Sequence, residues 1–238
     1  MRPPWWARPT AAVLFGGGGV WPARVHGADA VPGAGPVLFA SNHLGLLDGP
    51  MVVGCAPRWT QCLVKEELFT TGLGPVLRAT GQIPVRRDQG DRAALGRALD
   101  VLAGGGAVCV FPEGTRGRGD MGSVRLGLAW LALRSGAPVV PVACLGTRRT
   151  GRGTSSVPRP RVRPAVVFGE PFALRPEPGV PGRQALTLAG AALRGRLAAH
   201  VEAAVRLTGI PLPDDLGGPE DTRTADVRGA DTARGAQL

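Results

Sequence analysis

Residues 36–55 have the sequence PVLFASNHLGLLDGPMVVGC, an apolar run followed by a polar turn and a second apolar segment. The run Pro36–Ala40 has the length and composition of a buried β-strand. The pair Gly49-Pro50 marks a helix start, because proline is favoured in the first helical turn, and we expect a helix over Gly49–Cys55. A strand, a turn and a helix in direct succession are the repeating unit of an α/β protein.

The same alternation of short apolar runs and helical patterns continues along the chain. We expect further strands at Gln61–Lys65, Gln82–Arg86, Ala107–Phe111, Pro138–Leu145 and Val162–Phe168. We expect further helices, where apolar residues recur at helical spacing, at Glu66–Thr80, Arg92–Ala103, Ser123–Ser135 and Gln184–Leu207. Pro141 lies inside one of the strands and lacks a backbone donor, which predicts a β-bulge or a sheet edge. The whole pattern predicts an α/β fold, a single-domain sandwich with a largely parallel or mixed central sheet flanked by helices.

The two ends of the chain differ in composition from its centre. A chain of 238 residues, 44% of them hydrophobic, is long enough to form one large core. We expect this main domain over residues 31–212. Residues 213–238 have no apolar periodicity, which predicts a disordered tail.

The first 30 residues predict an N-terminal arm. Their apolar run is interrupted by four glycines and is shorter than the roughly 20 residues that cross a bilayer. Tryptophans accompany arginines here, which is typical of a segment lying at a membrane interface (Trp5, Trp6 and Trp21). A flexible arm is the alternative. Ala28-Asp29-Ala30 imitates a signal-peptidase site, but the interrupted run disfavours secretion.

The net charge of +10 is unevenly distributed. Residues 213–238 contain six acidic residues and three arginines, which give this segment a net charge of −3. The preceding 212 residues therefore carry a net charge of +13. The strong positive charge of residues 1–212 predicts an anionic partner: a nucleic acid, an anionic lipid surface or a phosphorylated small molecule. Nucleic acid is disfavoured, because the sequence has no zinc-ligand spacing, no helix-turn-helix pattern and no RNA-binding aromatic motif.

The four cysteines indicate the redox compartment. Cys55, Cys62, Cys109 and Cys144 lie in or beside apolar stretches, without the spacing of a metal site or a disulfide framework. We therefore expect buried, reduced thiols in a cytosolic protein.

His43 and Asp48 are the first candidates for chemistry. A histidine oriented by an aspartate is the usual general base near neutral pH. On a regular helix, residues five apart lie about 140° apart around the axis, so these side chains meet only if the pair straddles a turn or a helix start. Gly45 and the Gly49-Pro50 pair favour such a turn. The alternative is that Asp48 caps the following helix and His43 is a loop residue.

Two further segments end in residues that suit a phosphate group. Arg86 and Arg87 close a predicted strand, where ligands of α/β proteins bind, and a guanidinium holds phosphate bidentately. The alternative is a solvated arginine pair. The string Phe111-Pro112-Glu113-Gly114-Thr115-Arg116 follows another predicted strand. Its glycine lets backbone N–H groups approach an anion that its threonine and arginine can bind directly, although a purely structural turn is the alternative.

Taken in order, these segments resemble the four motifs of the glycerolipid acyltransferase family, the bacterial 1-acyl-glycerol-3-phosphate acyltransferases and their relatives. The first motif, Asn-His-x-x-x-x-Asp, is matched by Asn42, His43 and Asp48. The second, Gly-x-Ile-x-x-x-Arg, is matched by Gly81, Ile83 and Arg87. The third, Phe-Pro-Glu-Gly-Thr-Arg, is matched in full by residues 111–116, and the fourth, an apolar Val-Pro-Val strand, by residues 140–142. The resemblance covers about residues 36 to 170.

Three features depart from the family pattern. Many relatives have a serine two residues after the histidine, where this chain has Gly45. Many have a lysine before the helix that follows the third motif, where this chain has Arg125. The N-terminal segment is shorter and richer in glycine than the two-helix membrane anchor of well-known bacterial members. These departures leave the histidine and aspartate intact, but they leave acceptor choice and membrane docking open.

The resemblance implies how the site would work. His43 would take the proton from an acceptor hydroxyl as that oxygen attacks the thioester carbonyl of an acyl donor, and Asp48 would orient the imidazole. Arg87 and the turn Glu113-Gly114-Thr115-Arg116 would bind the glycerol phosphate of the acceptor. The resemblance implies no covalent nucleophile, no metal and no cofactor. The co-substrate would be acyl-CoA or acyl carrier protein.

The implied function is transfer of a fatty acyl group to the free hydroxyl of 1-acyl-glycerol-3-phosphate, giving phosphatidic acid. The implied partners are the acyl thioester donor, the lysophospholipid acceptor and an anionic membrane surface, with no nucleic acid. The implied location is cytoplasmic, peripheral at the inner face of the cell membrane. The alternatives are another lysolipid or an aminoacyl lipid as acceptor, a non-catalytic lipid-binding relative, and a nucleic-acid-binding protein.

Overall fold

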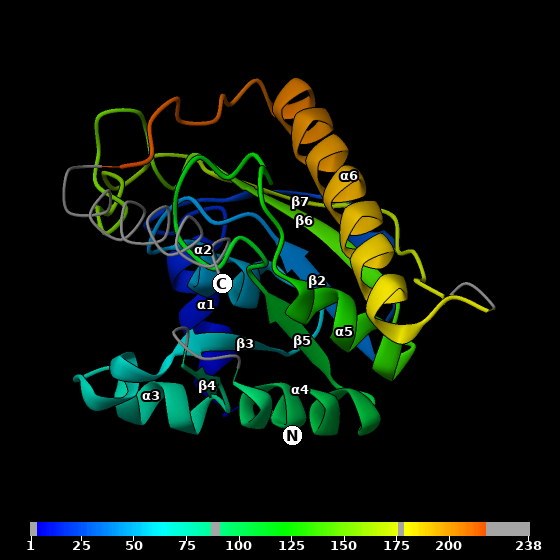
Figure 1. Cartoon of the computed structure of the whole chain (residues 1–238). Helices are drawn as coiled ribbons and strands as arrows, with labels where there is room; N and C mark the ends of the chain where they lie inside the picture. The colour runs from blue at the N-terminus through cyan, green and yellow to red at the C-terminus, as the bar shows by residue number, and fades with distance from the viewer. Residues whose placement is uncertain (1–3, 87–90, 176–178, 218–238) are drawn as a thin grey trace, which may run out of the picture.

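The computed structural model describes residues 4–86, 91–175 and 179–217, which form a seven-stranded sheet flanked by helices (Figure 1). The strands are β1 (Arg24–His26), β2 (Val37–Ser41), β3 (Thr60–Lys65), β4 (Ile83–Val85), β5 (Ala107–Val110), β6 (Val139–Leu145) and β7 (Ala165–Phe168). Their order across the sheet is β1-β7-β6-β2-β5-β3-β4. Neighbours pair in parallel, except that β7 runs antiparallel to β6. The predicted α/β sandwich with a mixed, largely parallel sheet is confirmed.

Helices cover both faces of this sheet. Within the described residues they are α1 (Ala7–Phe15), α2 (Asp48–Cys55), α3 (Gly74–Ala79), α4 (Arg92–Ala103), α5 (Leu126–Ser135) and α6 (Gly182–Thr208), with two short 3₁₀ helices, η1 (Ala28–Ala30) and η2 (Glu66–Thr70). Helices α4, α5 and α6 pack on one face, and α1 and α2 pack on the other (Figure 1). No helix in the described ranges has both the length and the apolar character needed to cross a membrane.

Strand β2 lies near the middle of the sheet and serves both layers. All five of its residues are buried, and successive side chains point to opposite faces. Leu38 and Ala40 join the core under α4, α5 and α6, whereas Val37 and Phe39 join the core under α1 and α2. Burial on both faces explains why this strand is a continuous apolar run in the sequence.

The predicted boundary at residue 30 is wrong. Helix α1 packs against α2, and β1 pairs with β7 in the main sheet. Both elements therefore belong to the main domain. The sequence pattern misses β1, because a three-residue edge strand whose side chains are half-buried or exposed carries no recognisable periodicity.

Two other predicted segments also need correction. The single helix expected over Glu66–Thr80 is divided into η2 and α3, since the chain becomes extended at Thr71 between them. The tail expected from residue 213 starts too early: Asp215 is bonded to Arg148, and residues up to 217 are placed. The remainder of that tail, residues 218–238, lies outside the described residues.

Pro141 lies in β6, between β7 and β2, so the sheet-edge alternative is wrong. Val142 pairs with Phe168, and Val139 bridges to Phe172. The facing segment therefore has one residue more between these two paired positions than β6 has. This extra residue is a bulge, as the alternative prediction has it. The interrupted pairing lies opposite the one residue of β6 that has no N–H to donate.

Candidate active site

The candidate site lies at the carboxyl ends of three neighbouring parallel strands, and the predicted residues that the structure describes follow two of them, β2 and β5. Strand β2 leads into the turn with His43, β5 leads into residues 111–116, and β6 leads into the loop with Thr147. The helix after β2 and the helix after β5 lie on opposite faces of the sheet. In α/β proteins, strand ends whose connections diverge in this way are where ligands bind.

His43 and Asp48 contact each other as the spacing predicts. His43 Nδ1 and Asp48 Oδ2 are 2.8 Å apart, Asp48 is fully buried, and His43 is nearly so. Asp48 is the first residue of α2, and His43 lies in the turn before it, so the pair straddles a helix start. The capping alternative is wrong, because the carboxylate accepts hydrogen bonds from N–H groups that precede the helix.

Four donors converge on the Asp48 carboxylate. Oδ2 accepts from the N–H groups of Leu44 at 2.6 Å and Gly45 at 2.8 Å, in addition to the imidazole. Oδ1 accepts from the hydroxyl of Thr147 at 2.5 Å. A carboxylate is an acceptor only, so the arrangement favours the tautomer of His43 that has its proton on Nδ1 and a free lone pair on Nε2.

The turn after β5 holds the backbone and the ring of His43. The ring of Phe111 stacks on the imidazole with centroids 4.2 Å apart. The N–H of His43 donates to Glu113 Oε2 at 2.8 Å, and the carbonyl of His43 accepts from the N–H of Gly117 at 2.9 Å. The first and third motifs are therefore one structural unit.

Glu113 is engaged with the protein backbone. Its second oxygen accepts from the N–H of Met121 at 3.3 Å. Burial raises the pKa of Glu113 to about 7, although the bonds from His43 and Met121 lower it, and the nearby carboxylates of Asp120 and Asp48 raise it further. The side chain of Glu113 thus connects the turn after β5 to the backbone of His43 and Met121. Its predicted contact with the glycerol phosphate of an acceptor stays a prediction.

The other residues of the third motif lie around the same turn. Gly114 has a φ of +74°, and a Cβ there would collide with the guanidinium of Arg125. Thr115 and Arg116 line the same cavity as His43. Arg87, predicted to bind phosphate, lies outside the described residues.

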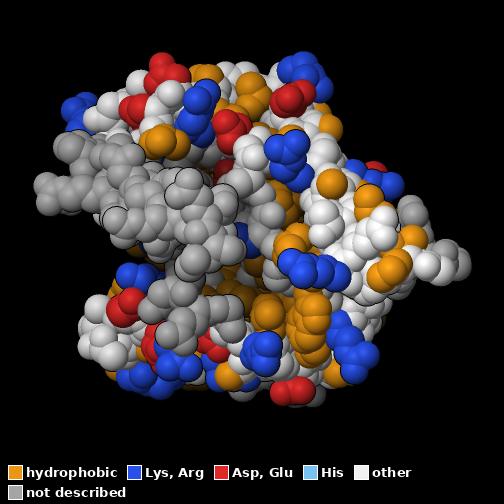
Figure 2. Space-filling model, viewed as in Figure 1, with side chains coloured by type: hydrophobic (Ala, Val, Ile, Leu, Met, Phe, Trp, Pro, Cys, Tyr) orange, Lys and Arg blue, Asp and Glu red, His pale blue; other side chains and the backbone are white. Residues whose placement is uncertain are grey.

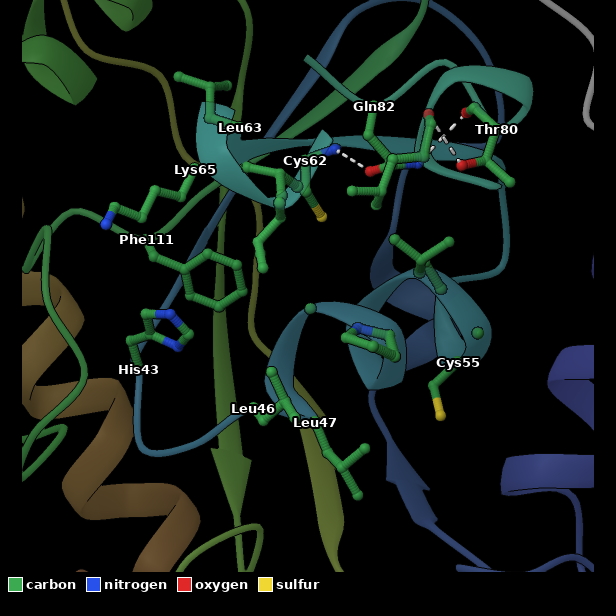
Figure 3. A pocket seen from close by; sticks show the side chains of 18 of the residues that line it. His43, Leu46, Leu47, Cys55, Cys62, Leu63, Lys65, Thr80, Gln82 and Phe111 are labelled. Atoms are coloured by element: carbon green, nitrogen blue, oxygen red, sulfur yellow. Dashed lines mark hydrogen bonds between the residues drawn. The ribbon is translucent and has the colours of Figure 1, made fainter. Parts of the chain in front are cut away.

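A cavity of about 1510 Å³ opens beside the imidazole. In Figure 3 the ring of His43 lies against Phe111 at the cavity wall, and apolar side chains such as Leu46, Leu47 and Leu63 surround the space. Figure 2 shows a hollow on one face of the molecule, where hydrophobic side chains gather and basic side chains border them. The cavity can accommodate a long apolar chain next to the imidazole of His43.

A family model of acyltransferases matches residues 22–145, slightly more than half of the chain. The chain belongs to the acyltransferase family. A chloroplastic 1-acyl-sn-glycerol-3-phosphate acyltransferase of Brassica napus is 27% identical over 128 residues, which are 52% of this chain and 37% of the plant protein. The chain thus spans little more than a third of this relative's length. The 1-acyl-sn-glycerol-3-phosphate acyltransferase of Bacillus subtilis is 26% identical over 176 residues, 73% of this chain and 85% of the bacterial protein.

A solved acyltransferase has a related fold. The crystal structure of the 1-acyl-sn-glycerophosphate acyltransferase from Thermotoga maritima matches with a TM-score of 0.57 at 24% identity, covering 77% of this chain and 72% of that one. At this identity the likeness supports the fold alone. The family predicted from the four motifs is confirmed.

Gly45 and Arg125, which depart from the acyltransferase pattern, both lie against the site. A Cβ at Gly45 would be 3.3 Å from the carbonyl oxygen of Thr147 and 3.5 Å from Cβ of Arg148. The missing side chain lets the loop after β6 approach Asp48 closely. The side chain of Arg125 crosses the turn at Gly114 and lines the cavity.

Burial separates most of the cysteine thiols from solvent. All four are free thiols, and three of them are buried. Cys55 is half-buried and lines the cavity, but burial raises the pKa of its thiol to about 12. Within the described ranges, no group of three or more His, Cys, Asp and Glu residues is arranged to hold a metal ion.

Sequence reasoning misses two residues that hold this candidate site together. Thr147 follows the fourth motif, and its position after a strand next to β2 is the signal that points to it. Asn42 belongs to the first motif, but its role emerges only from the structure: its amide accepts from the N–H of Cys144 at 2.7 Å and donates to the carbonyl of Cys144 at 3.1 Å. The amide therefore ties the end of β2 to β6.

Proposed function

We propose that this protein transfers a fatty acyl group from an acyl thioester to the free hydroxyl of 1-acyl-glycerol-3-phosphate, giving phosphatidic acid. The observation that carries the proposal is the 2.8 Å contact between His43 and Asp48 at the wall of a largely apolar cavity. The names of the plant and bacterial relatives support the choice of acceptor.

The proposed reaction is a direct attack without an acyl-enzyme. Nε2 of His43 takes the proton of the acceptor hydroxyl while the oxygen attacks the thioester carbonyl. The tetrahedral intermediate then collapses, the C–S bond breaks, and the leaving thiolate takes the proton back from the imidazolium. Asp48 stabilises the positive imidazolium in between, as the buried aspartate of a triad does.

The acceptor phosphate would lie among the basic residues of the cavity. Lys65, Arg116 and Arg125 line it together with His43, and Arg87 is the further candidate from the sequence. Guanidinium groups suit phosphate because they bind it bidentately. The donor is acyl-CoA or acyl carrier protein, and no cofactor is part of the proposal. The proposed place of action is the inner face of the cell membrane, with the protein bound peripherally.

The first test is an acceptor screen with a radiolabelled acyl donor. We expect turnover of lysophosphatidic acid that exceeds turnover of other lysophospholipids and of aminoacyl lipids. The screen is informative because Gly45, where many relatives have serine, lies beside the site. The N–H of Gly45 donates to Asp48, which together with His43 we call the dyad. Good turnover of another acceptor with none of lysophosphatidic acid would sink the proposed substrate while keeping the chemistry.

The second test replaces the base. We expect His43→Ala to lower the rate by about 10² to 10⁴-fold, the usual contribution of general base catalysis, and to leave the fold intact by circular dichroism. The control is His26→Ala, a histidine on β1 that does not line the cavity. A His43→Ala variant that keeps most of its activity shows that the base is assigned to the wrong residue. A wild type without transfer favours the non-catalytic, lipid-binding alternative.

A further inference from the structure

Arg148 is a buried arginine that none of the four motifs contains. Its side chain is fully enclosed, although arginine is rarely buried unless its charge is paired. It follows Thr147, whose hydroxyl holds Asp48. A charged group enclosed this close to the dyad calls for a specific role.

The guanidinium of Arg148 joins three segments that are distant in the sequence. Nη2 donates to the carbonyl of Gly117, in the turn after β5, at 2.9 Å, and to the carbonyl of Asp215 at 2.7 Å. Nη1 donates to the carbonyl of Arg152 at 3.0 Å and forms an ion pair with the carboxylate of Asp215. Because the guanidinium is planar and its donors are fixed in a fork, these bonds set the positions of the three segments relative to one another.

Asp215 makes the connection from the C-terminal side. Its carboxylate also accepts from the N–H groups of Gly151 at 2.5 Å and Gly217 at 3.2 Å. The next residue, Leu216, lines the cavity and packs beside Gly117. Residues 214–217, which we call the C-terminal strap, therefore bridge the turn after β5 and the loop after β6.

Two of the three segments that Arg148 joins each contact one of the two residues His43 and Asp48. The N–H of Gly117 donates to the carbonyl of His43, and the hydroxyl of Thr147 donates to Asp48. Arg148 is thus one hydrogen bond from Gly117 and one residue from Thr147. A catalytic pair needs its geometry held within about 0.5 Å, so a loose segment on either side would misalign it.

We propose that Arg148 and Asp215 form a positioning pair, which keeps His43 and Asp48 aligned through Gly117 and Thr147. The kinetic part of this proposal rests on the proposed acyl transfer. The pair acts through other residues, so its loss should lower kcat and change KM little, as expected when alignment rather than binding is lost.

The test compares Asp215→Asn with Asp214→Asn in the full chain. Both changes remove one negative charge at adjacent positions, but only Asp215 forms an ion pair with Arg148. We expect kcat to fall by about tenfold or more in Asp215→Asn, with KM within about twofold of wild type, while Asp214→Asn behaves as wild type. Arg148→Lys, a compact ammonium that cannot reproduce the fork, should resemble Asp215→Asn, and Asp215→Glu should recover part of kcat.

A second readout observes the dyad without any substrate. The Nδ1 proton of His43, bonded to Asp48, should give a downfield resonance in proton NMR spectra. We expect this resonance to match in wild type and Asp214→Asn, and to shift or broaden in Asp215→Asn. If acyl transfer itself fails in the wild type, the resonance still decides whether the pair positions the dyad.

An unchanged resonance together with wild-type kcat per folded molecule, in a variant that has only lost thermal stability, would overturn the proposal. The pair would then serve stability alone. If Asp215→Asn does not fold, Arg148→Lys and Asp215→Glu are measured in the same two ways, and the same outcomes decide.

Discussion

At the scale of single residues, Asp48 has a task that only a carboxylate performs. An imidazole, two backbone N–H groups and the hydroxyl of Thr147 all donate to it. An asparagine amide would turn an NH₂ group toward some of these donors, because it offers only one acceptor oxygen. The converging donors also hold the Asp48 carboxylate in one orientation beside His43.

Gly114 should not tolerate a side chain. Its positive φ disfavours any L-residue, so Gly114→Ala should strain the turn that carries Glu113, and the new Cβ should also force the side chain of Arg125 out of its place against this turn. We expect a lower thermal midpoint and a transfer rate reduced by about tenfold or more, measured by scanning fluorimetry and by the acyl-transfer assay. The control is Gly136→Ala, which has a φ of +64° and nothing within 4 Å of an added Cβ. Equal losses in both variants would contradict a role for the collision.

Glu113 should make stability depend on pH. Its pKa in the folded protein is raised to about 7 from an ordinary value near 4.5, so the folded state binds its proton more tightly than the unfolded state. This contribution is fully present below pH 4.5 and is lost as pH rises through about 7. The shift is about 2.5 pKa units, and with one unit equal to about 1.4 kcal/mol the loss should be on the order of 3 kcal/mol.

Urea denaturation between pH 4.5 and 7.5 measures this effect. We expect Glu113→Gln to lack the part of the pH dependence that the wild type shows over this range. Glu202→Gln, at an exposed position of α6, is the control and should keep the wild-type curve shape. Parallel curves for wild type and Glu113→Gln would exclude a proton on Glu113 as the cause.

At the scale of elements, the packing of α1 against α2 builds one wall of the cavity. Both helices contribute lining residues, and they approach each other at Gly54 of α2. A Cβ at Gly54 would be 2.7 Å from the ring of Phe15 and 3.2 Å from Cβ of Ala11, both on α1. Glycine at this position therefore sets the distance between the two helices.

Gly54→Ala should push α1 away from α2. In a helix interior the change from glycine to alanine normally stabilises by about 0.5–1 kcal/mol, but here the contact should cancel that gain. We expect the thermal midpoint to fall relative to wild type. We also expect KM to rise relative to wild type, and to rise more for long-chain donors than for short-chain donors. The matched control is Gly96→Ala in α4, where nothing lies within 4 Å of the new Cβ, and it should be neutral or stabilising. A Gly54→Ala variant that is stabilised as much as Gly96→Ala would refute the tight contact.

At the scale of the whole molecule, the basic body predicts binding to anionic membranes. The first 212 residues carry +13, nearly all of it arginine, since Lys65 is the only lysine. An arginine near an anionic surface contributes about 1 kcal/mol, and salt weakens the attraction.

Flotation with liposomes tests this prediction. We expect the protein to float with vesicles that contain phosphatidylglycerol, to float less as salt is added, and to remain unbound with neutral phosphatidylcholine vesicles. A gel-shift assay with duplex DNA runs in parallel, because nucleic acid is the rival anionic partner. Tight, steeply salt-dependent binding to DNA without flotation would favour that rival.

The sequence predicted the central elements to within a few residues. Strands such as β2 and β5 are buried on both faces and therefore appear as continuous apolar runs, which short segments such as β1 do not. The sequence also identified the dyad residues and the turn after β5, because their spacing matches the motifs of one family. It left the contact between His43 and Asp48 open, since a capping aspartate has the same local pattern.

The sequence by itself determined the fold class, the family and the residues at the ends of β2 and β5. Only the tertiary structure decided that His43 and Asp48 contact each other and which residues hold them together. Thr147 is 99 residues from Asp48, and Asp215 is 67 residues from Arg148, so no local pattern can pair them. Parallel strands bring their carboxyl ends to one edge of the sheet, and it is this juxtaposition that assembles distant residues around one carboxylate.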